Sequence, residues 1–132
     1  MPFPDEAWCA AAIDAFNADP DAVGATEGWT WDFGLVVDRP QGALGFYIGV
    51  PYAGRLPRPV AMAPEELQAR APAYHARATE ADWRALVEGE LDPIPALVQR
   101  RLVAQGDLHQ VIARLHYRGL AERWLQHLRG TV

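Results

Sequence analysis

The sequence of 132 residues contains no lysine and no serine, so all twelve of its basic side chains are arginine. These absences exclude a Ser-His-Asp triad, a Schiff-base lysine and the lysine of a phosphate-binding P-loop. The single cysteine, Cys9, excludes disulfides within the chain and cysteine-based zinc sites. Because Cys9 follows Trp8 on or near an apolar helix face, we expect a small buried hydrophobic side chain rather than a reactive thiol. Many classes of enzyme are therefore excluded.

Long apolar runs are also missing. No stretch of about 18 uninterrupted apolar residues exists, so we expect no membrane-spanning helix. The first residues lack the basic start of a secretory signal, which favours a cytoplasmic protein. The net charge of −5 argues against binding to nucleic acid. Half of the residues are apolar, 23 of them alanine, and the length fits a single domain over residues 1–132.

Charge is distributed unevenly along the chain. Residues 1–38 hold eight acidic residues and no arginine, whereas residues 95–132 hold six arginines and two acidic residues. The simplest interpretation is that the two terminal regions have solvated faces of complementary charge. A site for an anionic ligand or a lipid head group near the C-terminal arginines is the alternative.

The apolar spacing predicts an α+β fold. Residues 5–17 have the pattern of an amphipathic helix capped by Asp5, and residues 17–28 have the composition of a loop. Residues 29–37 and 43–50 alternate as two antiparallel strands that share one strongly apolar face, which helices must cover. Gly45 and Gly49 lie on the opposite face and indicate the close approach of another element, a partner subunit or a ligand.

The second half of the chain is predicted to alternate short strands with capped helices. Residues 60–63 suit a short strand, residues 64–70 a turn of helix, and residues 73–79 an edge strand. Thr79 with Asp82 begins a helix that Gly89 ends. Further elements are expected as a helix from Pro93, a strand at 102–104, a helix from Asp107 and an amphipathic segment from Leu120.

The run from Thr79 to Pro93 resembles a hallmark of the sterol carrier protein type 2 family. It combines a short helix bearing Trp83 with the sequence Gly89-Glu90-Leu91-Asp92-Pro93, and a later strand and Gly-Asp turn at 102–108 are also similar. The likeness covers roughly residues 5–117, and the order of the expected elements agrees with it. The chain departs from the family at Arg100, where glycine is usual, and at Leu97, where phenylalanine is frequent. An aspartate frequent in the family is missing near Ala73.

The resemblance implies a mostly antiparallel sheet of about five strands with helices packed on one face. It also implies an apolar tunnel between sheet and helices for a fatty acid, acyl-CoA, sterol or isoprenoid-like lipid. Ten apolar residues of the strand faces and helix stripes are the candidates to line it: Trp31, Phe33, Leu35, Phe46, Ile48, Trp83, Leu97, Leu115, Trp124 and Leu125. The same residues would also fill an ordinary solid core, and periodicity does not distinguish the two.

We therefore expect a lipid carrier without catalytic activity, cofactor or metal. Its partners would be a hydrophobic small molecule and an enzyme, a membrane or a second copy of the chain. His109 and His116 lie roughly 10 Å apart on one helix, which is too far for one metal ion. Two alternatives stay open: an accessory module with a closed core that supports an enzyme of a lipid or quinone pathway, and a small enzyme acting on an apolar substrate.

Overall fold

The computed structural model describes residues 3–115, 119–129 and 131, and within that part the chain forms an α+β structure with a five-stranded sheet. The strands are β1 (Phe33–Asp38), β2 (Leu44–Ile48), β3 (Val60–Met62), β4 (Tyr74–Thr79) and β5 (Val103–Gln105). The helices are α1 (Glu6–Asn17), α2 (Pro20–Thr26), α3 (Pro64–Arg70), α4 (Glu80–Glu88), α5 (Pro93–Val98), α6 (Leu108–Leu115) and α7 (Leu120–Leu128).

The sheet has the strand order β3-β2-β1-β4-β5 and is mixed. Three of its four pairings are antiparallel, as expected, and β1 pairs with β4 in parallel. The prediction that residues 73–79 form an edge strand is wrong, because β4 lies between β1 and β5. The three residues of β5 pair with only part of β4. The polar residues His75 and Arg77 alternate with apolar ones along β4, and this alternation resembles that of an edge strand.

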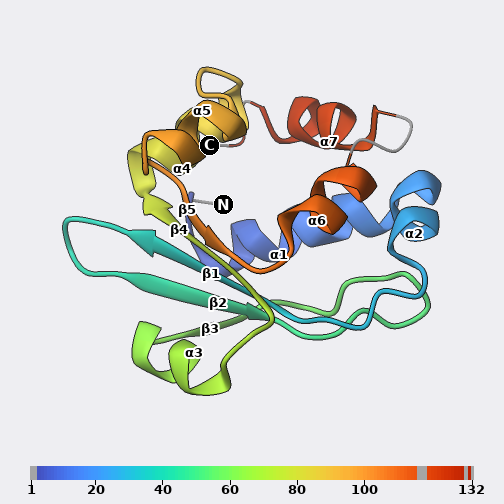
Figure 1. Ribbon diagram of the computed structural model, residues 1–132, viewed down its shortest axis with the longest axis horizontal. Helices are drawn as coiled ribbons and strands as arrows, with labels where there is room; N and C mark the ends of the chain where they lie inside the picture. The colour runs from blue at the N-terminus through green and yellow to red at the C-terminus, as the bar shows by residue number, and fades with distance from the viewer. Residues whose placement is uncertain (1–2, 116–118, 130, 132) are drawn as a thin grey trace.

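Helices lie on both faces of the sheet, most of them on one (Figure 1). Helices α1, α4 and α7 contact one another above the face that carries Leu35 and Phe46. Helix α3 packs on the opposite face, where the fully buried Leu67 lies over Gly34 and Gly45. A Cβ on Gly34 would lie 3.1 Å from Leu67 Cδ1 and 2.7 Å from Pro72 Cγ. At Gly45, a Cβ would lie 2.9 Å from the carbonyl oxygen of Met62 and 3.4 Å from Leu67 Cδ2, so the close approach expected there is made by elements of this chain. At Gly49 the nearest atom to such a Cβ, Pro57 Cγ, lies at 3.5 Å, which is an ordinary contact.

Local capping chemistry sets several of the helix ends. The Asp5 carboxylate accepts a hydrogen bond from the backbone N–H of Trp8 at 2.7 Å, and Thr79 caps α4 through the N–H of Asp82 at 3.1 Å. Gly89 ends α4 in the left-handed conformation (φ +79°). These three assignments from the sequence are confirmed.

Two assignments in the first third of the chain are wrong. Residues 17–28 include the helix α2, which Asp19 caps through the N–H of Asp21 and in which Pro20 occupies the first position. The strand predicted for 29–37 begins only at Phe33, because Trp29 and Trp31 belong to an aromatic cluster that precedes the ladder.

Complementary charge ties the two terminal regions together. Arg123 on α7 lies 3.0 Å from both the Asp19 and the Asp21 carboxylates, 104 and 102 positions away in the sequence. The simpler interpretation of the uneven charge distribution is therefore confirmed for this arginine.

Candidate ligand-binding cavity

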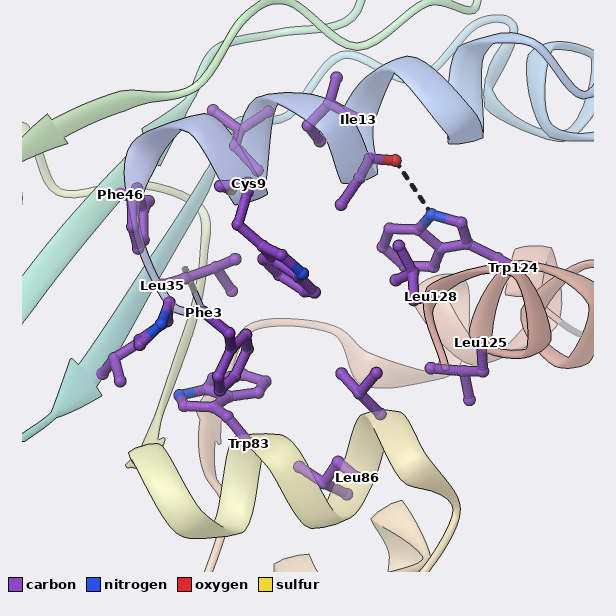
Figure 2. A pocket seen from close by; sticks show the side chains of 16 residues that line it. Phe3, Cys9, Ile13, Leu35, Phe46, Trp83, Leu86, Trp124, Leu125 and Leu128 are labelled. Carbon is purple, nitrogen blue, oxygen red and sulfur yellow. Dashed lines mark hydrogen bonds between the residues drawn. The ribbon is translucent and has the colours of Figure 1, made fainter. Parts of the chain in front are cut away.

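An apolar cavity of about 190 Å³ lies between the sheet and the helices α1, α4 and α7. Figure 2 shows its labelled side chains converging from these elements on one space. The cavity is lined by Phe3, Pro4, Trp8, Cys9, Ala12, Ile13, Leu35, Val37, Phe46, Ile48, Trp83, Leu86, Val87, Trp124, Leu125 and Leu128. None of these side chains carries a formal charge at neutral pH.

The periodicity of each element explains why these side chains meet. Alternation along β1 and β2 directs Leu35, Val37 and Phe46 to the same face of the sheet. Positions three and four apart place Trp8 and Ala12 on one side of α1, and Trp124 and Leu128 on one side of α7. Apart from Phe3 and Pro4, which precede α1, the walls thus come from the strand face and helix stripes that the sequence pattern defines.

Three indole N–H groups around the cavity donate hydrogen bonds to protein oxygens. Trp83 Nε1 donates to the carbonyl oxygen of Val36 at 2.9 Å. Trp124 Nε1 donates to the carbonyl oxygen of Ala12 at 3.0 Å, the hydrogen bond drawn in Figure 2. Trp8 Nε1 donates to Thr131 Oγ1 at 3.0 Å. Because these donors are engaged, the indole rings present carbon to the cavity, which suits an apolar occupant.

The cavity wall also contains the only cysteine of the sequence, and its thiol stays protonated at neutral pH. Burial, with a smaller effect from the charge of Glu6, raises the pKa of Cys9 to about 12. A thiol is a weak nucleophile unless it loses its proton. The structure therefore agrees with a buried hydrophobic role for Cys9.

The structure brings six of the ten sequence-predicted residues to the cavity. They are Leu35, Phe46, Ile48, Trp83, Trp124 and Leu125. Leu115 falls at the end of α6, where its side chain lies outside the described residues. That any of these side chains contacts a ligand stays a prediction.

The other three predicted residues lie elsewhere. Trp31 and Phe33 belong to a cluster with Trp29 and Tyr74, in which the Trp29 and Phe33 rings stack with centroids 5.6 Å apart. This cluster lies at the start of β1, and none of its four residues lines the cavity. Leu97 is half-buried on α5 and does not line the cavity.

Sequence reasoning missed ten of the lining residues, for two different reasons. Trp8, Ala12, Ile13, Val37, Leu86, Val87 and Leu128 stand in apolar stripes that the pattern reveals, so the signal was present. Phe3 and Pro4 precede the first helix, where no periodicity marks a residue as buried. Cys9 was assigned to the apolar face without being assigned to the cavity.

The described residues offer no sign of a metal centre. No group of three His, Cys, Asp or Glu side chains gathers as ligands within residues 3–115, 119–129 and 131. His109 is exposed, whereas His116 lies outside the described residues. Within the same ranges, no helix is both long and apolar enough to cross a membrane.

With this geometry, the chain has the fold of sterol carrier protein 2. A crystal structure of sterol carrier protein 2 matches with a TM-score of 0.69 at 19% identity, over 98% of both chains. A conserved hypothetical protein from Thermus thermophilus, described as possibly a sterol carrier protein, matches with a TM-score of 0.64 at 23% identity, over 95% of this chain and 85% of the other. No protein-family model and no curated protein matches the sequence.

A third solved structure has a different biological setting. The ubiquinone synthesis protein UbiJ-SCP2 matches with a TM-score of 0.58 at 15% identity, over 93% of this chain and 97% of the other. At these identities the likeness concerns the fold.

Proposed function

We propose that this protein binds the apolar part of a lipid-like small molecule in the cavity and carries it without chemical change. The main support for this proposal is a cavity of about 190 Å³ whose walls present only apolar surface. The indole N–H groups around it are hydrogen-bonded to oxygen atoms of the protein. The solved structures named sterol carrier protein 2 support a ligand of this kind.

The size of the cavity bears on which part of a lipid fits. Cavities of about 150 Å³ accept benzene, and pockets for drug-sized ligands begin at about 300 Å³. The volume of about 190 Å³ therefore suits a short stretch of an acyl or isoprenoid chain. Each buried methylene contributes about 0.8 kcal/mol, so a tail of about six would gain about 5 kcal/mol before the costs of binding. A longer tail or a sterol needs the walls to move.

The chemistry of the walls supports carriage rather than catalysis. The Cys9 thiol is kept protonated by burial, and the described lining side chains include no carboxylate, imidazole or hydroxyl group. A general acid or base would have to lie within hydrogen-bond reach of the reacting atoms. Delivery of the ligand to an enzyme or a membrane is then the simplest use of the cavity.

Binding is tested with purified protein by native mass spectrometry, organic extraction and displacement of a fluorescent fatty acid. We expect a co-purified lipid or saturable displacement for the wild type. The Ala12→Leu variant extends a cavity-lining side chain into the space and should lose binding. The matched control is Ala7→Leu on the exposed side of the same helix, which should bind normally. Absence of binding by the wild type, or equal binding by both variants, would refute the proposal.

A second function, an accessory module for an enzyme of a lipid or quinone pathway, is favoured by one surface feature. Ile94 and Val98 lie one turn apart on α5, and 57% and 79% of their surfaces are exposed. The likeness to UbiJ-SCP2 supports this alternative. It predicts that the Ala7→Leu and Ala12→Leu variants both keep their function while Val98→Asp loses it, as a pull-down of the partner enzyme would show.

A further inference from the structure

The connection between β2 and β3 contains a tight hairpin at residues 52–55. The backbones of Tyr52 and Arg55 exchange two hydrogen bonds, at 2.9 and 3.0 Å, and so close a two-residue turn. Ala53 and Gly54 between them both have positive φ, +52° and +79°, as a type I′ turn requires. Because the side chain of alanine disfavours this conformation, the contacts around the turn have to hold it in place.

Contacts with α1 and α2 fix this hairpin. Asn17, at the end of α1, donates from Nδ2 to the carbonyl oxygen of Leu56 at 2.9 Å and accepts the N–H of Leu56 at 2.8 Å. A Cβ on Gly54 would overlap the carbonyl oxygen of Val23, so the backbone of the turn packs directly on α2. The hairpin is therefore held at its turn and at its base.

The apolar side chains on and beside the hairpin nevertheless face solvent. Tyr52 is 86% exposed, and within residues 3–115, 119–129 and 131 its hydroxyl has no hydrogen-bond partner. Val50 is 49% and Trp31 38% exposed. Both leave the same end of the sheet, because Phe33 at the start of β1 pairs with Ile48 at the end of β2 (Figure 1). Exposed apolar side chains gathered on a fixed backbone are a feature of interaction sites.

The charge beside these side chains is positive. Residues 49–63 contain Arg55 and Arg58 and no acidic residue, although the net charge of the chain is −5. In the part of the chain that the structure describes, neither arginine forms an ion pair, whereas Arg77 and Arg101 each lie 2.6 Å from an aspartate. Two cations are thus available next to the exposed rings.

Most carboxylates on the adjoining segment are already engaged. Residues 17–32 contain four acidic residues. Asp19 and Asp21 lie 3.0 Å from an arginine of α7, and Asp32 accepts hydrogen bonds from a tyrosine hydroxyl and a main-chain N–H at 2.7 and 2.8 Å. Among the described residues of this segment, Glu27 is the one acidic side chain without such a partner. The surface therefore complements a negatively charged partner.

Aromatic rings beside arginines suit the interface of an anionic membrane. Tyrosine and tryptophan are enriched at the level of the lipid head groups, where the ring meets apolar chains and its polar atom meets water. The planar guanidinium of arginine matches the oxygen atoms of a phosphate. An acid-free surface on an otherwise acidic chain also determines which side of the protein approaches a negatively charged membrane.

We propose that this hairpin surface docks the protein on a membrane of anionic phospholipids. The surface consists of Trp31, Val50, Tyr52, Arg55 and Arg58. The inference rests on the proposed function, because a carrier has to meet the membrane from which it takes its ligand or to which it delivers it. The fixed turn presents the Tyr52 ring to the head groups without any further ordering of the chain.

The test is co-sedimentation of the purified protein with vesicles of phosphatidylcholine alone or of phosphatidylcholine and phosphatidylglycerol in equal parts. The wild type should bind the mixed vesicles more tightly, and high salt should reduce the difference. Arg55→Gln should weaken binding to the mixed vesicles about fivefold, the contribution of one arginine near such a surface. Tyr52→Ser should weaken binding to both kinds of vesicle, because the interfacial ring is lost.

Matched controls make similar changes away from the hairpin. Arg100→Gln removes an exposed arginine that also has no ion pair among the described residues and that precedes β5, at the end of the sheet where β4 ends. It should bind vesicles as the wild type does. Val98→Ser alters a valine that is more exposed than Val50, yet only Val50→Ser should weaken binding.

The outcomes separate docking from ligand binding. Failure of the wild type to bind the mixed vesicles, or an equal loss in Arg55→Gln and Arg100→Gln, would overturn the inference. Displacement of a fluorescent fatty acid tests the proposed function separately, and Arg55→Gln and Tyr52→Ser should leave it unchanged. A wild type that docks but binds no fatty acid would overturn the proposed function and leave the docking surface in place. A dimer in analytical ultracentrifugation that Tyr52→Ser abolishes would assign the surface to a second copy of the chain and overturn membrane docking.

Discussion

Substitution of Ala12 by leucine distinguishes a real cavity from a solid core by the sign of its effect on stability. Ala12 is 4% exposed on α1, lines the cavity and packs in a cluster with Val87 and Leu128. A leucine here adds three carbon atoms to an apolar space of about 190 Å³. At about 0.8 kcal/mol for each buried carbon, the free energy of unfolding should rise by about 2 kcal/mol.

The opposite effect is expected if the space is filled in solution. Extra carbon atoms in a close-packed core force side chains from their preferred rotamers and cost about 1–3 kcal/mol. The two possibilities therefore differ by several kcal/mol and in sign. The control Ala7→Leu stands on the exposed side of α1 and should change stability by no more than about 0.5 kcal/mol.

The measurement is equilibrium unfolding in urea, followed by the fluorescence of the five tryptophans after extraction of any bound lipid. A rise in the midpoint with an unchanged slope would support the cavity. A destabilised Ala12→Leu beside a neutral Ala7→Leu would refute the reasoning, because it would show that the side chains already fill the space.

Two further predictions concern the other face of the sheet. Leu67→Ala should destabilise the protein by about 2–5 kcal/mol, because Leu67 is fully buried over Gly34 and Gly45. Because Leu67 lies on the face of the sheet opposite the cavity, isothermal titration calorimetry with octanoate as the probe should find its affinity unchanged. Burial, and to a smaller extent the charge of Arg77, lower the pKa of His75 in the folded protein below 6.5. As the pH drops below about 6.5, the imidazole is therefore protonated in the unfolded chain before it is protonated in the folded protein. The free energy of unfolding should fall over this range, down to the folded-state pKa. Urea titrations between about pH 7 and pH 5 should show a smaller loss of stability for His75→Asn; an equal loss in both proteins would contradict this assignment.

Features set by neighbouring residues could be predicted from the sequence. The caps at Asp5 and Thr79 and the helix end at Gly89 follow from hydrogen bonds and backbone conformations within a few positions. The helix α2 was missed although Asp19-Pro20 is a suitable helix start, because the glycine in its middle and the surrounding acidic residues resemble a loop.

Features set by distant residues could not be predicted in the same way. Placement of β4 between β1 and β5 depends on a parallel pairing across about 40 residues, which no local pattern records. The sequence marked both Leu35 and Phe33 as apolar strand residues on one face, but only Leu35 reaches the cavity. Phe33 is instead covered by Trp29 and Tyr74. Periodicity assigns a face, and the position along that face depends on which element covers it.

The persistence of an apolar cavity requires a physical cause, because dispersion forces favour its collapse. The three indoles provide one. Trp83 fixes α4 to the main chain of β1, Trp124 fixes α7 to the main chain of α1, and Trp8 fixes α1 to Thr131 beyond the end of α7. Shifting α4 or α7 to close the space would break the part-buried bond of Trp83 or Trp124 and leave a polar group without a partner, at a cost of about 1–3 kcal/mol each, whereas the exposed bond of Trp8 contributes less. The same tryptophans that line the cavity with carbon therefore also hold its walls apart.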